Sequence, residues 1–145
     1  MTLHRFRFIA LLVVSCAASS LITARFMKIQ QARADSNRVY ELRVDRTLPG
    51  RLGALSDRVG RLQKLFVRYN MTPVGFWIPQ DSPGKENMFI YMLSHESREA
   101  ARKNPAAFGA DPEWKELQKT TEADGKIIEK FEQTFLNPVS YSPLK

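Results

Sequence analysis

Glu41 and Arg43 are two residues of this chain whose types and spacing could bind or activate a small molecule. Arg43 comes two positions after Glu41, so both side chains project from one face if this segment is an extended strand. An arginine oriented by a carboxylate could bind a ligand carboxylate or an enolate. A structural ion pair at a subunit interface is the competing interpretation, and both remain open at this point.

Three further residues are candidates for the same site. His95 is the only histidine after residue 4, which makes it the best acid–base candidate near neutral pH. Tyr91 precedes it by four positions and shares its strand face, so the two are the catalytic candidates. Trp77 could form a wall of a ligand cavity. Structural roles compete here too: capping for His95, and core packing for Tyr91 and Trp77.

The composition argues against several kinds of chemistry. The single cysteine, Cys16, and one of the two histidines, His4, lie near the start of the chain. The remaining sequence therefore lacks a thiolate nucleophile, a disulfide and a Cys- or multi-His metal site. It also shows no nucleophile motif and no phosphate-binding loop. We predict neither a metal nor a cofactor.

The positive charge is concentrated at the N-terminus. The formal net charge of the 145 residues is +7, but residues 1–34 hold five basic and no acidic side chains. Residues 35–145 hold 17 basic and 15 acidic side chains, a net charge of +2. A domain with so small a net charge lacks the electrostatic field that attracts phosphates, so we predict no nucleic-acid partner.

Residues 1–34 have the pattern of a signal peptide. Arg5 and Arg7 precede an apolar stretch over residues 8–18, and Ala-Arg-Ala at 32–34 stands just before Asp35. The apolar stretch is shorter than a membrane-spanning helix. We predict cleavage after Ala34 and export to the periplasm or outside the cell. The alternatives are a retained membrane anchor, a mitochondrial transit peptide, and lipid attachment at Cys16.

The remaining chain, 35–145, shows alternating strand and helix patterns. Residues 38–45 alternate as a strand, and we assign Tyr40, Leu42 and Val44 to the face that packs on helices. Residues 51–69 form an amphipathic helix with arginines on a solvated outer face. Further strands are expected at 72–79, 87–94 and 126–136. A helix capped by Ser94 or Ser97 follows and is kinked or ended by Pro105, and a short helix starts at Asp111 with Pro112.

The order β-α-β-β-α-β, with the second helical region split, predicts a ferredoxin-like α+β fold. Its four-stranded antiparallel sheet carries helices on one face only. The opposite face is too apolar to remain in water, so we predict a homodimer in which two sheets face each other, as in a dimeric α/β barrel. In this arrangement Glu41 and Arg43 would lie between the sheets.

Five motifs in order resemble the NIPSNAP family over residues 38–145. They are Val39-Tyr-Glu-Leu-Arg43 with Pro49-Gly50, Val74-Gly-Phe-Trp77, Tyr91-Met-Leu-Ser-His-Glu-Ser-Arg-Glu-Ala-Ala101, Ala110-Asp-Pro-Glu-Trp114 and Tyr141-Ser-Pro-Leu-Lys145. The resemblance implies a dimeric α/β barrel built from ferredoxin-like halves. It implies no settled reaction, although the wider superfamily includes small monooxygenases. Asp45 departs from the family pattern, in which an aromatic residue commonly follows the first strand.

Two functional hypotheses follow. In the first, the domain is a homodimeric binding or interaction module whose partner is a protein or a small anionic ligand. In the second, it is a small cofactor-free oxygenase-like or isomerase-like enzyme that acts on an anionic molecule through Arg43, Tyr91 and His95. We favour the first, because no catalytic motif supports the second. Any membrane contact would come through an uncleaved or lipidated leader.

Overall fold

The computed structural model describes residues 23, 25, 27, 28 and 37–144 of the chain. By its internal contacts the chain divides into two units, residues 1–36 and residues 37–145. The apolar stretch at 8–18, Cys16 and the Ala-Arg-Ala site lie outside the described residues. Among the described residues, no helix is both long and apolar enough to cross a membrane.

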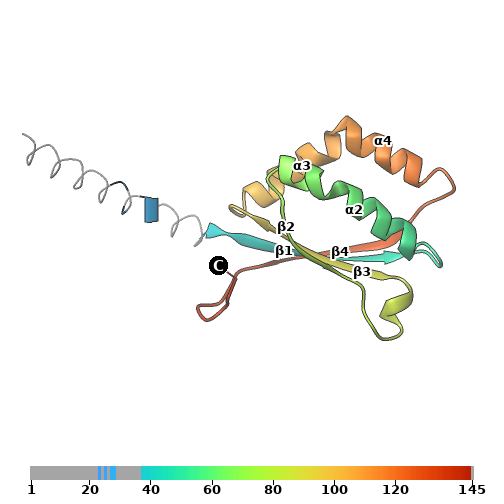
Figure 1. Ribbon diagram of the computed structural model, residues 1–145, viewed down its shortest axis with the longest axis horizontal. Coiled ribbons are helices and arrows are strands. Elements are labelled where there is room, and N and C mark those ends of the chain that lie inside the picture. The colour runs from blue at the N-terminus through green and yellow to red at the C-terminus, as the bar shows by residue number, and fades with distance from the viewer. Residues whose placement is uncertain (1–22, 24, 26, 29–36, 145) are drawn as a thin grey trace, which may run out of the picture. The chain divides into compact units, whose positions relative to one another are not determined.

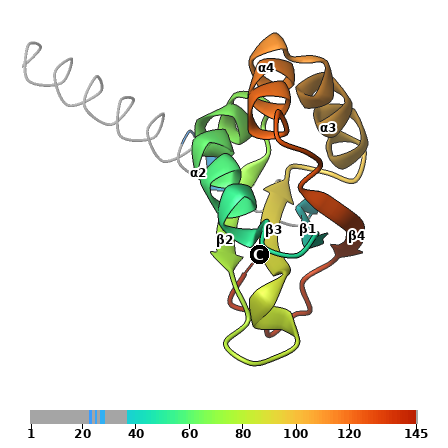
Figure 2. The same ribbon diagram turned by 90° about the vertical axis from the view of Figure 1, so that its right-hand side faces the viewer.

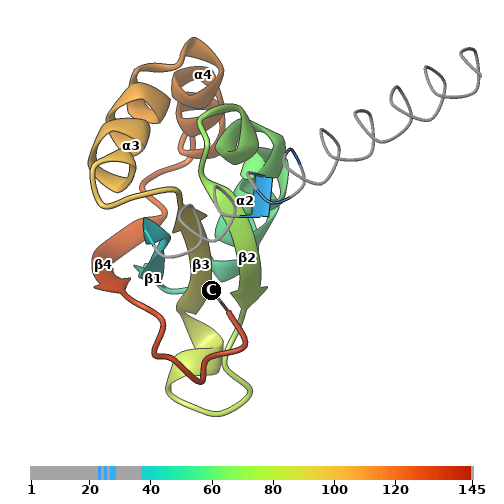
Figure 3. The ribbon, with the colours of Figure 1, turned by 90° about the vertical axis from the view of Figure 1, so that its left-hand side faces the viewer.

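The second unit is a four-stranded antiparallel sheet with helices on one face (Figure 1). Its elements follow the order β-α-β-β-α-α-β, and the strands lie in the order β2-β3-β1-β4 across the sheet. The helices lie on the same face of the sheet in the two opposite side views, each turned by 90° from Figure 1 (Figures 2 and 3). This arrangement confirms the predicted ferredoxin-like fold with a split second helical region. The bounds of the elements are β1 Val39–Thr47, α2 Leu52–Arg68, β2 Thr72–Trp77, β3 Met88–His95, α3 Ala100–Ala110, α4 Pro112–Thr121 and β4 Ile128–Leu136.

The ends of the helices are set by residues with suitable backbone conformations or capping side chains. Gly50, with a φ of 75°, lies in the turn before α2, and Asn70, with a φ of 52°, follows its C-terminal end. The carboxylate of Asp111 accepts hydrogen bonds from the backbone N–H groups of Glu113 at 2.6 Å and Trp114 at 3.3 Å. The predicted start of the short helix at Asp111 is therefore confirmed.

The expectation that the preceding helix could end at Pro105 is wrong, whereas a kink at Pro105 stays a prediction. Helix α3 continues through Pro105 to Ala110. At its start, the hydroxyl of Ser97 accepts a hydrogen bond from the backbone N–H of Ala100 at 3.1 Å. Pro105 stands in the middle of this helix, where it removes one backbone hydrogen bond, and the packing of Phe108 against Phe66 with ring centroids 5.3 Å apart holds the next turn. Tertiary packing outweighs the local preference here.

The core lies between α2 and the sheet. Its centre is formed by apolar residues of α2, including Leu55, Val59, Leu62, Leu65 and Phe66, all at most 4% exposed. These side chains pack on the residues of β3 that face the helices, which are Phe89, Tyr91 and Leu93. This packing fixes which face of the sheet is covered by helices, and the functional candidates are placed relative to it.

Candidate functional site

The charged face of β1, not its apolar face, points toward the helices. Glu41, Arg43 and Asp45 pair with Leu93, Tyr91 and Phe89 of β3, which belong to the core beneath α2. The three charged residues are at most 8% exposed.

Our assignment of Tyr40, Leu42 and Val44 to the helix-packed face is therefore wrong, and so is the placement of Glu41 and Arg43 between two facing sheets. The alternation of the strand was correct, but alternation alone does not say which face a helix covers. Here the buried face is the charged one. Its burial is tolerated because Glu41 and Arg43 find hydrogen-bond partners within the same chain.

Glu41 is the centre of the buried hydrogen-bond network. Its Oε2 lies 2.7 Å from Nε2 of His95, and its Oε1 accepts hydrogen bonds from Nε of Arg43 and from Nε2 of Gln133. Burial opposes ionisation of Glu41, but the hydrogen bonds from His95, Arg43 and Gln133 and the charge of Arg43 outweigh it and lower its pKa to about 2. Glu41 is thus an ionised carboxylate that holds its neighbours in place.

Arg43 links Glu41 to Tyr91. Its Nη1 donates a hydrogen bond to the Tyr91 hydroxyl at 3.3 Å, and its guanidinium carbon lies 5.6 Å from the centroid of the Tyr91 ring and 5.7 Å from that of Phe131. Burial raises the pKa of Tyr91 to about 12 against the opposing charge of Arg43. The tyrosine therefore remains a neutral phenol near pH 7, and it can donate its O–H to a ligand oxygen.

Arg43 and Tyr91 line a cavity between the sheet and the helices. Its volume is about 170 Å³. Two further ionisable residues, Asp45 from β1 and Arg58 from α2, also line it, and the rest of the lining is aromatic or aliphatic, including Phe108 and Trp114. A mostly apolar cavity with a few converging polar groups is the usual composition of a small-molecule site.

Asp45 differs from Glu41 in its surroundings. It is 2% exposed, and its Oδ1 has no hydrogen-bond partner among the residues that the structure describes. Burial raises the pKa of Asp45 to about 6, although the positive charges of Arg43 and Arg58 act in the opposite direction. A carboxyl group in this position can exchange a proton near neutral pH.

Arg58 is buried, although the sequence predicted it on a solvated helix face. It is 2% exposed, donates a hydrogen bond from Nη1 to Oε1 of Glu122 at 2.8 Å, and stacks over the Trp114 ring at 5.6 Å. Two other arginines of this region also pair with acids of the α4 region: Arg51 with Asp124, and Arg68 with Glu113. The helix therefore uses several of its basic residues to hold the α4 segment.

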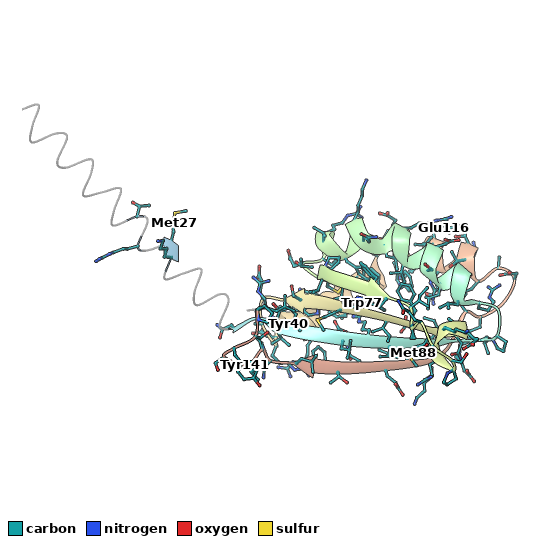
Figure 4. All side chains as sticks on the ribbon, turned by 60° about the horizontal axis from the view of Figure 1, so that its bottom comes forward. Met27, Tyr40, Trp77, Met88, Glu116 and Tyr141 are labelled. Carbon is teal, nitrogen blue, oxygen red and sulfur yellow. The ribbon has the colours of Figure 1, made fainter. Side chains whose placement is uncertain are left out.

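The structure brings together four of the five predicted site residues. Glu41, Arg43, Tyr91 and His95 form one connected network, whereas Trp77 lies elsewhere. Its side chain is half exposed and lies over Gly75, where an added Cβ would come within 2.5 Å of the ring. Trp77 is visible on β2 in Figure 4. It does not line the cavity, and neither does His95, which contributes through Glu41.

Sequence reasoning missed Asp45, Arg58 and Gln133 as site residues. One signal was available: Asp45 continues the alternation of Glu41 and Arg43, so it had to share their face. For Arg58 and Gln133 the pattern gave no signal, because their proximity depends on the packing of α2 and on the register of β4. Among the described residues, no group of three or more His, Cys, Asp or Glu side chains could hold a metal ion.

The fold and the site together define an α+β protein of the ferredoxin-like class with a mostly apolar cavity, lined by a few polar groups, between the sheet and the helices. The model of the NIPSNAP family matches residues 40–143. The chain therefore belongs to the NIPSNAP family, as the motifs predicted. No curated protein matches it.

Solved structures with the same fold include two bacterial NIPSNAP proteins. A NIPSNAP-like domain protein from Burkholderia xenovorans has 19% identity and a TM-score of 0.62, over 74% of this chain and 90% of the other. A NIPSNAP family protein from Agrobacterium tumefaciens has 24% identity and a TM-score of 0.61, over 76% and 96%. The cofactor-independent oxygenase SnoaB from Streptomyces nogalater is more distant, at 13% identity and a TM-score of 0.51 over 74% and 98%.

Proposed function

We propose that this protein is a homodimeric small-molecule-binding module whose ligand site is the cavity between the sheet and the helices. The observation that carries the proposal is the composition of the cavity. Two arginines, one buried aspartate and one neutral tyrosine converge on about 170 Å³ of otherwise apolar space. Burying so many polar groups has a cost that a purely structural core avoids, and a ligand would explain their presence.

The charge balance of the cavity favours an uncharged ligand over the anionic one suggested by the sequence. Arg43 is already paired with Glu41, and Arg58 with Glu122. Asp45 adds a further negative charge whenever it is ionised. A permanent anion would therefore meet an excess of negative charge in a poorly hydrated space. A neutral, mostly apolar molecule with a carbonyl or hydroxyl oxygen fits better, because arginine N–H groups and the Tyr91 O–H can donate to that oxygen.

The size of the cavity limits the ligand. At about 30 Å³ for each water molecule in the liquid, 170 Å³ corresponds to about six waters, so the ligand is a small monocyclic or bicyclic compound. Phthalide, a neutral aromatic lactone, is a suitable probe. Trp114 lines the cavity and is one of two tryptophans, so Trp77→Phe leaves a single fluorophore at the site.

The test is a titration of the Trp77→Phe protein with phthalide, followed by Trp114 fluorescence, together with native mass spectrometry of the freshly purified protein. We expect saturable quenching that Arg58→Met weakens at least tenfold. Arg61→Met, at an exposed position on the same helix, should leave it unchanged. Absence of both quenching and a retained molecule would contradict the proposal, and so would equal effects of the two substitutions.

The proposed dimer rests on the sheet face opposite to the helices. Register places Leu42, Val44, Ile90 and Met92 on this face, and all four are only partly buried within one protomer. The C-terminal segment reaches one end of it, where Leu136, Asn137, Pro138, Val139, Ser142 and Leu144 line a pocket together with Tyr40 and Met92. Figure 4 labels Tyr40 and Tyr141. A second copy would cover the remaining apolar area.

Export is a further part of the proposal and depends on residues 1–34. The pattern of basic start, apolar stretch and Ala-Arg-Ala supports cleavage after Ala34. N-terminal sequencing of the protein from the cells that make it tests this directly, and Asp35 is the expected first residue. A chain that starts at Cys16 would replace cleavage at Ala34 with lipid attachment, and an intact Met1 would replace it with a retained anchor.

A further inference from the structure

Asp45 has a feature that ligand binding alone does not require. Asp45 is one of the residues that line the cavity, it is 2% exposed, and its buried Oδ1 has no hydrogen-bond partner among the described residues. Glu41, two residues earlier on the same strand face, has three donors. Buried carboxylate oxygens are normally satisfied within the protein, so one left without a donor at a cavity indicates a partner supplied from outside.

The groups around the cavity suit a ligand that loses a proton there. Arg43 from β1, Arg58 from α2 and Tyr91 from β3 are the other ionisable groups that line it. The contacts of Arg43 with Glu41 and Tyr91, and that of Arg58 with Glu122, use only part of the five N–H donors of each guanidinium. If a neutral ligand passed a proton to Asp45, the negative charge would move from Asp45 to the ligand oxygen. The total charge of the cavity would stay the same.

We propose that Asp45 is the proton acceptor for an uncharged, enolisable carbonyl compound bound in this cavity, which makes the protein a catalyst of enolisation. Asp45 takes a proton from the carbon next to the carbonyl, the electron pair of the broken C–H bond forms a C=C bond, and the π pair of the carbonyl moves onto its oxygen. Arg43, Arg58 and Tyr91 donate hydrogen bonds to the resulting enolate. Return of a proton to carbon completes an exchange or a tautomerisation, and no oxidant or cofactor is consumed.

This inference rests on the proposed ligand site and deepens it, because it names the class of ligand and the reacting residue. Two probe compounds, tested on the same protein, therefore separate the claim of ligand binding from the claim of proton transfer. Phthalide cannot enolise and reports binding alone. The ketone 2-indanone has a similar size, is neutral, and has acidic C–H groups next to its carbonyl, so it reports proton transfer.

The experiment follows the exchange of these C–H groups of 2-indanone for deuterium in D₂O by NMR, using the full chain and subtracting the buffer rate. We expect the wild-type protein to accelerate exchange, with a rate that rises with pH through about 6 as Asp45 ionises. Asp45→Asn keeps the shape of the side chain but cannot accept the proton, and it should lower the rate about 100-fold or more. Asp57→Asn, at an exposed position on α2, is the matched control and should leave the rate unchanged.

The outcomes distinguish the two claims. Saturable phthalide binding together with exchange at the buffer rate would overturn the role of Asp45 and leave the ligand site standing. Exchange that survives in Asp45→Asn while phthalide still binds would also overturn it. Failure of the wild-type protein to bind either compound would overturn the ligand site and the inference together. A folded Asp45→Asn protein is verified by its melting curve and its retained phthalide binding.

Discussion

Nε2 of His95 lies 2.7 Å from Oε2 of Glu41, across the β1–β3 pair, and both side chains are fully buried. A carboxylate whose pKa is about 2 can only accept a hydrogen bond, so the imidazole proton lies on Nε2. The other ring nitrogen, Nδ1, has no partner among the described residues. His95 therefore orients Glu41, and Glu41 in turn orients Arg43 toward the cavity.

Removing only Arg43 should lower the free energy of unfolding more than replacing Glu41 and Arg43 together with apolar residues. Arg43→Ala leaves the buried Glu41 carboxylate without its cation, and we expect a loss of about 3–5 kcal/mol in the free energy of unfolding. A double variant with leucine at both positions removes the two charges together and should lose less. Urea unfolding of the three proteins gives the comparison. A double variant that is less stable than Arg43→Ala would show that the ion pair is itself strongly stabilising.

Glu41 should also make the protein sensitive to acid. Its pKa is about 2 in the folded protein against 4.5 in the unfolded chain, so it stabilises the fold above pH 4.5, and this stabilisation is lost as the pH falls toward 2. At about 1.4 kcal/mol for each pH unit, Glu41→Gln should cost about 3 kcal/mol at pH 7 and progressively less below pH 4.5. Unfolding measured from pH 7 to pH 2.5 tests this. Glu116→Gln, at an exposed position on α4, is the control and should show no such trend.

The fold could be predicted from the sequence because its elements are locally encoded. The strand at 39–47 alternates, α2 has an amphipathic repeat, and Asp111 with Pro112 marks a helix start. The four clustered site residues also followed from local spacing: Glu41 and Arg43 are two positions apart, which places them on one face of β1. Tyr91 and His95 share a face of β3 for the same reason.

The location of the site could not be predicted, because it depends on which face of β1 the helices cover. Apolar alternation suggested that Leu42 and Val44 are internal, but the helices cover the charged face. That choice depends on long-range partners: Gln133 is 92 residues from Glu41, and Arg58 reaches Glu122 across 64 residues. An apolar strand face directed away from the helices is the arrangement expected if a second protomer covers it.

The dimer proposal predicts a specific effect at Ile90, which lies on the outer face of β3. The wild-type protein should sediment at twice the protomer mass at micromolar concentration. Ile90→Glu places a charge in the proposed interface and should shift sedimentation to the protomer mass. Ile78→Glu, just after β2 and already 44% exposed, is the matched control and should leave the dimer intact. A wild-type protein that sediments as a single protomer would contradict the proposal.

Asp45→Asn should stabilise the folded protein at neutral pH. Its carboxyl group has a pKa of about 6 in the folded protein against 3.8 in the unfolded chain, so between these values the folded state binds more protons and the wild-type protein loses stability as the pH rises. The asparagine variant avoids this loss. At about 1.4 kcal/mol for each pH unit, its advantage should be near zero at pH 3.5 and grow to about 2–3 kcal/mol at pH 7.

Urea unfolding at pH 3.5, 5, 6 and 7 measures this advantage, with Asp57→Asn as the exposed control that should show none. A buried carboxyl group that weakens the fold yet occupies a ligand cavity is characteristic of a residue kept for function, because most functional sites carry such a cost. If Asp45→Asn is instead the less stable protein at pH 7, Arg43 and Arg58 stabilise the carboxylate more than burial disfavours it. Asp45 would then be a structural counter-ion of the two arginines.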